Sequence, residues 1–146
     1  MAPLIVLVCV TALARLSGLV VQPLNDWPVA TAIGLAAMFV MTSITHFVQP
    51  RRRGLIAIVP PVFARPDILV SITGALEFFG AVGLLVPVTR VAAAGCLGLL
   101  LLVLFPANVY AAGAQRHPDS PHTPLVARTV YQLVFLAACI VVVVGV

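Results

Sequence analysis

The side chain with the clearest capacity for chemistry is Glu77, a carboxylate in the middle of the apolar stretch 67–87. About 20 apolar residues in a helix are enough to cross a bilayer, and an ionised side chain at mid-depth is costly unless it has a partner. The residues three and four positions away are small or weakly polar, namely Thr73, Gly74, Gly80 and Ala81. Because these positions share one helix face with Glu77, we expect the carboxylate to point into a helical bundle.

Other polar side chains interrupt the remaining apolar runs. They are Arg15, His46, Asn108, Arg128 and Gln132. A rise of about 1.5 Å per residue places Arg15 and Glu77 at similar depths, roughly 15 to 17 Å from one boundary, and the other four within about 3 to 9 Å of that boundary. The sequence therefore predicts an Arg15–Glu77 pair that forms the floor of a polar cavity open to one side.

Two interpretations of these residues remain open. In the first, Arg15 and Glu77 form a structural ion pair, the shallower amides and histidine bond between helices, and Arg128 extends to the headgroups. In the second, the cavity holds a head group or moves protons, as intramembrane ionisable groups often do. No metal site is predicted, because the helix of His46 carries no second histidine or carboxylate at ligand spacing.

The composition identifies the class of protein. Hydrophobic residues make up 62% of the 146 residues and charged residues only 8%, whereas soluble domains carry about 25% charged residues. The chain is therefore predicted to be one integral membrane domain, 1–146, embedded in lipid. Its net charge of +4 comes from arginines gathered in loops, which favours a role in topology and anionic-lipid attraction over nucleic-acid binding.

The apolar runs predict an all-α transmembrane bundle of five spans, at residues 3–21, 28–48, 67–87, 91–112 and 125–146. The first run could be a retained helix or a signal peptide, and retention is favoured because no basic residue precedes it. Paired prolines at 60 and 61 interrupt the segment 54–63, which we expect at the membrane surface or in a shallow re-entrant turn.

Loop charge predicts the orientation. Five spans put the amino terminus and the loops 49–66 and 115–124 on one side. Six arginines lie there (Arg51, Arg52, Arg53, Arg65, Arg116 and Arg128), against Arg90 alone on the other side. The amino terminus and these loops are therefore predicted to be cytoplasmic in a multi-pass protein of the cell membrane.

Three stretches together resemble the DoxX-like family of small bacterial membrane proteins. They are His46-Phe47 before a proline-rich loop, the segment 74–87 around Glu77, and Phe105-Pro106-Ala107-Asn108 followed by Arg128 and Gln132. The likeness covers roughly residues 28–140 and implies a four-helix core, here with an additional amino-terminal helix. Some DoxX-like proteins are small subunits of thiosulfate:quinone oxidoreductases or partners of other membrane redox systems. This chain has no paired cysteines, so its own residues do not indicate thiol chemistry.

Three functions follow as expectations. The resemblance implies an accessory, non-catalytic subunit of a bacterial inner-membrane redox complex, in which a quinone head group or a proton occupies the cavity. A lipid- or small-molecule-binding or transporting bundle would instead show a larger hydrophobic tunnel. A ligand-free scaffold would show a packed interior, and the small faces of spans three and four could also support a homodimer. The sequence leaves open whether the protein turns over a substrate.

Overall fold

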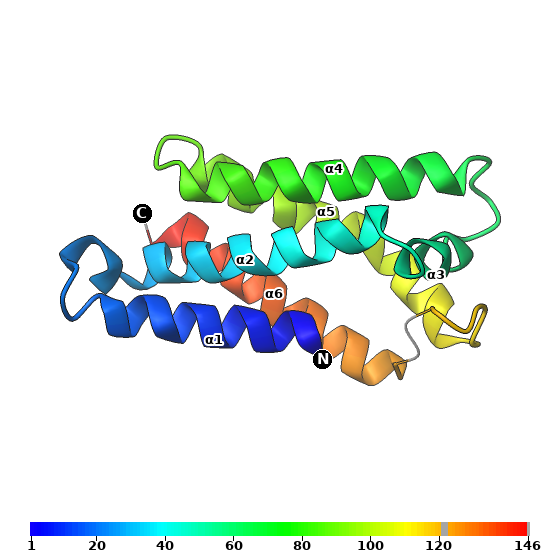
Figure 1. Cartoon of the computed structure of the whole chain (residues 1–146), viewed down its shortest axis with the longest axis horizontal. Helices are drawn as coiled ribbons and strands as arrows, with labels where there is room; N and C mark the ends of the chain where they lie inside the picture. The colour runs from blue at the N-terminus through cyan, green and yellow to red at the C-terminus, as the bar shows by residue number, and fades with distance from the viewer. Residues whose placement is uncertain (121–122, 146) are drawn as a thin grey trace.

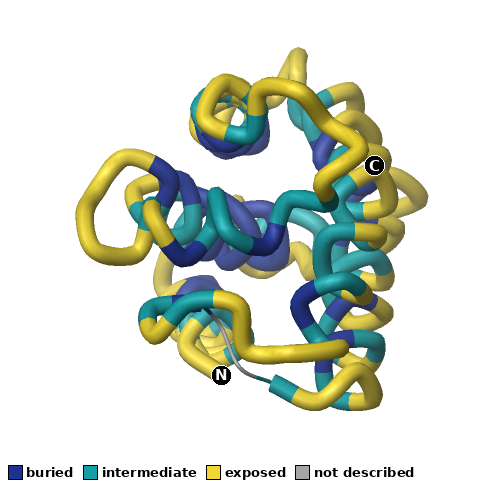
Figure 2. The backbone as a smooth tube through the Cα atoms, turned by 90° about the vertical axis from the view of Figure 1, so that its right-hand side faces the viewer, coloured by how far each residue is buried: buried dark blue, intermediate teal, exposed yellow. Residues whose placement is uncertain are grey.

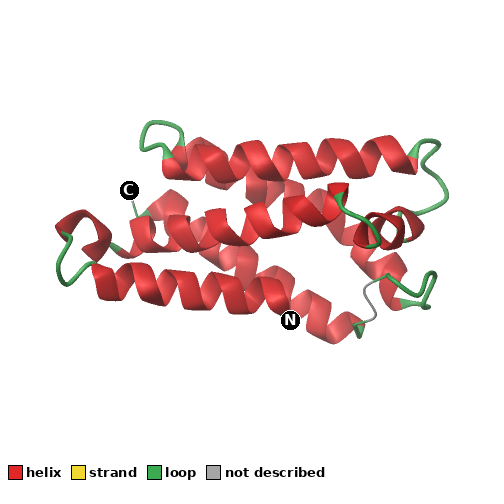
Figure 3. Cartoon of the chain, viewed as in Figure 1, coloured by secondary structure: helices red, strands yellow, loops and turns green. Residues whose placement is uncertain are grey.

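The computed structural model describes residues 1–120 and 123–145, and all regular structure in that part of the chain is helical (Figure 3). The helices, in chain order, are α1 (Ala2–Ser17), the short 3-10 helix η1 (Gln22–Asn25), α2 (Trp27–Phe47), α3 (Arg51–Ala57), α4 (Pro66–Leu85), α5 (Arg90–Ala112) and α6 (Leu125–Val144) (Figure 1).

Prolines set several of these boundaries. Pro28 and Pro66 lie in the first turns of α2 and α4, where a missing backbone N–H costs least. Pro124 directly precedes α6. Pro106 is the exception, since α5 continues through it for six more residues to Ala112.

Four long helices form a closed ring. Helix α2 packs on α4, α4 on α5, α5 on α6, and α6 returns to α2. Helix α1 lies outside this ring against α2, and α3 bridges the ends of α2 and α4 (Figure 1). This arrangement agrees with the expected four-helix core and additional amino-terminal helix.

The ring helices have 20 to 23 residues and are long and apolar enough to cross a membrane, which confirms a helical bundle suited to the bilayer. Their bounds lie within two residues of the predicted spans wherever the ends are described; the predicted end of the last span, Val146, lies outside the described residues. Helix α1 is shorter than predicted. Its 16 residues measure about 24 Å, less than the roughly 30 Å of a hydrocarbon core.

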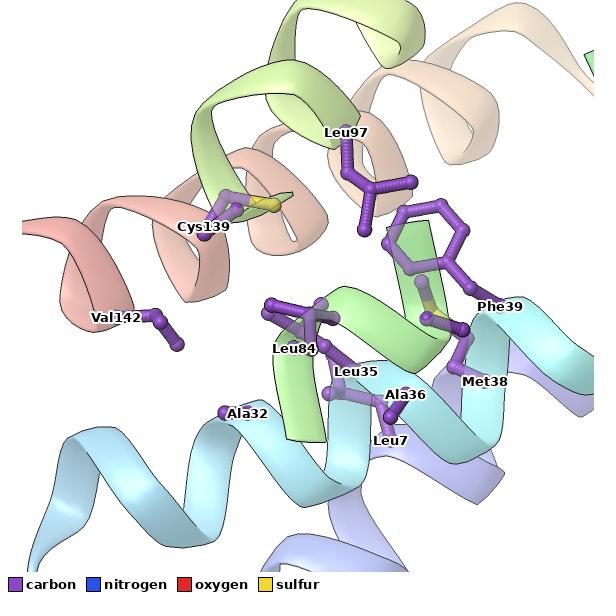
Figure 4. Close-up of a cluster of buried hydrophobic side chains, with 12 residues drawn as sticks. Leu7, Ala32, Leu35, Ala36, Met38, Phe39, Leu84, Leu97, Cys139 and Val142 are labelled. Atoms are coloured by element: carbon purple, nitrogen blue, oxygen red, sulfur yellow. The ribbon is translucent and has the colours of Figure 1, made fainter. Parts of the chain in front are cut away.

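Apolar side chains fill one half of the ring. Phe39 and Leu35 of α2 meet Leu84 of α4, Leu97 of α5 and Val142 of α6, all no more than 2% exposed (Figure 4). Buried positions face inward, whereas exposed residues cover the outer faces (Figure 2). Those outer faces carry many large aliphatic side chains, as expected for a surface in contact with lipid.

The two ends of the ring differ in charge. One end holds the last turns of α2 and α5, the first turns of α4 and α6, and α3; we call it the arginine-rich end because Arg51, Arg52 and Arg53 open α3 there. The opposite end holds the α1–α2 and α4–α5 turns (Figure 1).

Candidate functional site

The interior of the ring is polar toward the arginine-rich end. In α2, α4 and α6, helical spacing continues the buried stripe from apolar to polar residues, as from Phe39 to His46 in α2 and from Ala81 to Glu77 in α4. The polar residues of this region are Thr42 and His46 (α2), Glu77 (α4), Asn108 (α5), and Arg128 and Gln132 (α6). Every ring helix therefore contributes to one polar end of the core.

His46 and Glu77 form the centre of this region. Glu77 Oε1 lies 3.5 Å from His46 Nε2, and Glu77 Oε2 accepts a 2.7 Å hydrogen bond from the Thr42 hydroxyl. Glu77 is 6% exposed and His46 is 8% exposed. The predicted inward orientation of Glu77 is therefore correct, and its neighbours come from α2.

The contact of the other His46 ring nitrogen limits how His46 and Glu77 can bond to each other. His46 Nδ1 lies 2.8 Å from the backbone oxygen of Val70, and a carbonyl oxygen can only accept a hydrogen bond. Nδ1 therefore carries a proton. Nε2 then needs a second proton to bond to a carboxylate, unless Glu77 itself is protonated. One proton placed between His46 Nε2 and Glu77 would therefore bond the two side chains and leave the pair neutral overall.

Close contact between α2 and α4 holds this pair in place. A Cβ placed on Gly74 would come within 2.5 Å of His46 Cβ and 3.0 Å of a Phe47 ring carbon. Beside it, the Ser43 hydroxyl donates to the backbone oxygen of Gly74 at 2.9 Å. Glycine at this position therefore allows the imidazole to reach Val70 and Glu77.

Arg52 of α3 forms hydrogen bonds to α2 and α4 beside the His46–Glu77 pair. Its guanidinium donates to the backbone oxygens of His46 (2.6 Å) and Asp67 (3.1 Å) and to the Ser71 hydroxyl (2.9 Å). The first of these oxygens belongs to the last turn of α2, where carbonyls have no partner within the helix. Arg52 thus ties α3 to both helices that carry the pair.

A second polar group joins α5 and α6. Arg128 donates to Asn108 Oδ1 at 3.0 Å and to the backbone oxygen of Thr123 at 2.9 Å. One turn deeper, the Gln132 amide donates to the backbone oxygen of Leu101 at 2.7 Å. Asn108, Arg128 and Gln132, which the sequence predicted as site residues, therefore lie in one region. Each forms a hydrogen bond across the α5–α6 interface or to the segment that joins the two helices.

The predicted partner of Glu77 is wrong. Arg15 lies in the last turn of α1, at the opposite end of the ring, where it donates to the backbone and side-chain oxygens of Asn25 and sits 4.7 Å from the centre of the Trp27 ring. The chain turns soon after Ser17, so Arg15 is near a helix end rather than at mid-depth. With Arg15 counted at the same end as Arg90, the arginine count becomes six against two, and the excess of arginine stays at the arginine-rich end.

The predicted polar cavity is replaced by packed side chains in this region. Glu77, His46, Arg128 and Gln132 are all under a tenth exposed. Two open depressions instead lie on the outer surface of α2 and α4, and both are apolar. The first, of about 350 Å³, is lined by Ser43, Ile44, Phe47, Val48, Ala75, Phe78 and Phe79.

Sequence reasoning missed the hydroxyls and the arginine that complete the site. Thr42 precedes His46 by one helical turn, and that spacing could have predicted a shared partner. Arg52 could not be singled out from its two arginine neighbours, because its role depends on how α3 turns back over α2 and α4. Among residues 1–120 and 123–145, no group of three or more histidine, cysteine or acidic side chains could hold a metal ion.

Comparison with known families adds one assignment. A family model described as a domain of unknown function (DUF8561) matches residues 35–143, about three quarters of the chain, and the protein belongs to that family. The matched region contains both polar groups and excludes α1 together with Arg15. No curated protein and no solved structure matches the chain.

Proposed function

We propose that this protein is a non-catalytic accessory subunit of a membrane redox or quinone-linked system, in which His46 and Glu77 hold and pass a proton. The observation that carries the proposal is the buried pair itself, in which His46 Nε2 faces a carboxyl oxygen of Glu77 at 3.5 Å while Nδ1 is bonded to the backbone. Two-electron reduction of a quinone consumes two protons, so a complex that performs it inside the membrane needs groups that bring protons from water. The resemblance to DoxX-like proteins favours the same setting.

The packing favours a proton over a ring as the occupant of the site. A quinone head group would have to displace side chains that are 6 to 8% exposed, whereas a proton needs only donors and acceptors in line. His46 lies in the last turn of α2, one residue before its end, so its imidazole is close to the arginine-rich boundary. Glu77 lies deeper, eleven residues after the start of α4.

Orientation and span number belong to the same proposal. The six arginines at the arginine-rich end favour a cytoplasmic location for that end, so protons would enter from the cytoplasm. Helix α1 would form a fifth crossing by thinning the bilayer locally, with the flanking Arg15 and Trp27 at the boundary.

A ligand-free scaffold is the second candidate. It is favoured by the same packed interior, since a scaffold needs no opening and uses buried hydrogen bonds only to fix helix partners. The two candidates differ in one respect, which is whether Glu77 must ionise.

The test uses membranes of the source cell from which the gene has been deleted. Reduction of a short-chain ubiquinone analogue is followed with thiosulfate, NADH and succinate as donors, after complementation with wild type, Glu77→Gln or Asp67→Asn. The control removes an exposed carboxylate in the first turn of the same helix. We expect deletion and Glu77→Gln to lower the rate with one donor, while Asp67→Asn restores it.

Two other outcomes separate the candidates. Unchanged quinone reduction after deletion, with all three donors, would overturn the redox assignment. Full restoration by Glu77→Gln would show that the carboxyl group need not ionise, and would leave the scaffold as the function.

A further inference from the structure

The structure also points to a lipid-binding site on the outer surface of the α2–α4 pair, where we propose that an anionic membrane phospholipid binds with one acyl chain in the apolar groove and its phosphate at the arginines of α3. The site is separate from the His46–Glu77 pair and does not depend on the proposed function. Its parts are a groove at membrane depth and a group of cations at the mouth of that groove.

The groove is built from small and aromatic side chains. The small side chain of Ala75 on α4 leaves a space between α2 and α4. Phe78 and Phe79 of α4 form one wall of this space, and Phe47 and Val48 of α2 form the other. A second apolar depression, of about 470 Å³, continues from Ile44 toward Ile33 and Leu85. Together they follow α2 from residue 33 to 48, about 22 Å, whereas one acyl chain spans half of a roughly 30 Å hydrocarbon core.

Arg52 stands at the boundary end of this groove. Its guanidinium binds the hydroxyl of Ser71, which lies one turn before Ala75 on the same face of α4. It also binds the backbone oxygen of His46, next to Phe47 in the groove wall. The cation is therefore held between the two helices that form the groove, on the side where a phosphate would lie.

The charge at this position has no anionic partner in the protein. Within residues 1–120 and 123–145, no carboxylate lies within 4.0 Å of the guanidinium of Arg51, Arg52 or Arg53. Arg51 and Arg53 are exposed on either side of Arg52 in α3. Guanidinium groups match phosphate oxygens in geometry and charge, so the complementary ligand is an anionic headgroup on an apolar chain.

The alternative occupants lack one of the two features. A neutral quinone would fill the groove and leave the three cations without a counter-charge, and the phosphate of a zwitterionic lipid is already balanced by its own ammonium group. A second copy of this chain would bring the same arginines against themselves, which is unfavourable unless anions intervene. An anionic phospholipid satisfies both features at once, and the membrane supplies it.

The test measures the thermal stability of delipidated, detergent-solubilised protein titrated with phosphatidylglycerol or with phosphatidylcholine of the same acyl chains. We expect Tm to rise with phosphatidylglycerol and to change little with phosphatidylcholine. The double variant Arg51→Gln/Arg53→Gln should need about 30-fold more phosphatidylglycerol for the same shift, since each arginine near a membrane surface contributes about fivefold. Ala75→Phe, which fills the groove, should abolish the shift.

Both variants change groups that make no hydrogen bond in the described residues, so their lipid-free Tm should match wild type and serve as the folding control. Equal shifts with the two lipids would overturn the role of the arginines. A full shift retained by Ala75→Phe would overturn the groove. Protein dimerisation that Ala75→Phe prevents, without any lipid dependence, would instead identify the occupant as a second copy of the chain.

Discussion

Replacing Glu77 tests the one-proton pair most directly, because glutamine and leucine have nearly the same size as glutamate but different hydrogen bonds. In Glu77→Gln, the introduced amide oxygen can accept the bond from Thr42, and the amide N–H₂ can donate to His46 Nε2. His46 then stays neutral with its proton on Nδ1, bonded to Val70. Every bond of the native pair has a substitute, without any shared proton.

Glu77→Leu keeps the volume and removes both bonds. The Thr42 hydroxyl can turn to the backbone oxygen of Phe39, 3.1 Å away, but His46 Nε2 is left as a buried acceptor without a donor. An unsatisfied buried group costs about 1–3 kcal/mol, and interhelical bonds measured inside membrane proteins average about 0.6 kcal/mol with a maximum near 1.7. We therefore expect Glu77→Leu to lose about 1–3 kcal/mol of unfolding free energy and Glu77→Gln less than about 1 kcal/mol.

The assay is reversible unfolding in mixed micelles at neutral pH, with helix content as the signal. Arg15 supplies the control, because a charge pair between Arg15 and Glu77 would make Arg15→Gln and Glu77→Gln strongly coupled, whereas residues at opposite ends should be additive within about 0.5 kcal/mol. If Glu77→Gln were as damaging as Glu77→Leu, the substitute hydrogen bonds of the amide would not stabilise the pair, and the reasoning from hydrogen bonds would be refuted.

Three further predictions follow from contacts elsewhere. Gly74→Ala should lower the unfolding free energy by about 1–3 kcal/mol, because its Cβ would overlap the His46 side chain, whereas Gly95→Ala, which meets nothing within 4 Å, should be neutral or slightly stabilising in the same assay. Arg52→Ala should speed amide hydrogen exchange in α3 by freeing it from α2 and α4, and the exposed Arg65→Ala should not; equal rates would contradict the anchoring role. Buried Cys139 should resist a membrane-permeant maleimide that labels the other two cysteines, as read by mass spectrometry of the intact and digested protein.

The helices were predictable because a strongly apolar chain in a bilayer has few alternatives to helical structure. Backbone groups in lipid must bond within helices, so the last four predicted spans became helices within two residues of their expected ends where those ends are described. The inward face of Glu77 was predictable for a similar reason, since small residues at three- and four-residue spacing mark a helix contact. Gly74 is one of these small residues, and it allows close contact with His46 of α2.

The partner of Glu77 was not predictable from depth alone. Depth depends on where each helix ends, and the first helix ends at Ser17 instead of continuing to Val21. That early end moves Arg15 to the boundary, where its guanidinium reaches Asn25 and Trp27. His46 was expected at shallower depth than Glu77. The two side chains still reach each other, because both are long enough to span a depth difference of about one helical turn between adjacent helices.

Arg52 links the two sites that we propose. The same guanidinium binds the backbone oxygen of His46, whose ring faces Glu77, and the Ser71 hydroxyl at the mouth of the lipid groove. A phosphate bound there would draw on the same donors and reduce the hold of Arg52 on the end of α2. If a bound phosphate shifts the end of α2 enough to change the proton affinity of the pair, then by thermodynamic reciprocity protonation of the pair changes lipid affinity by the same factor.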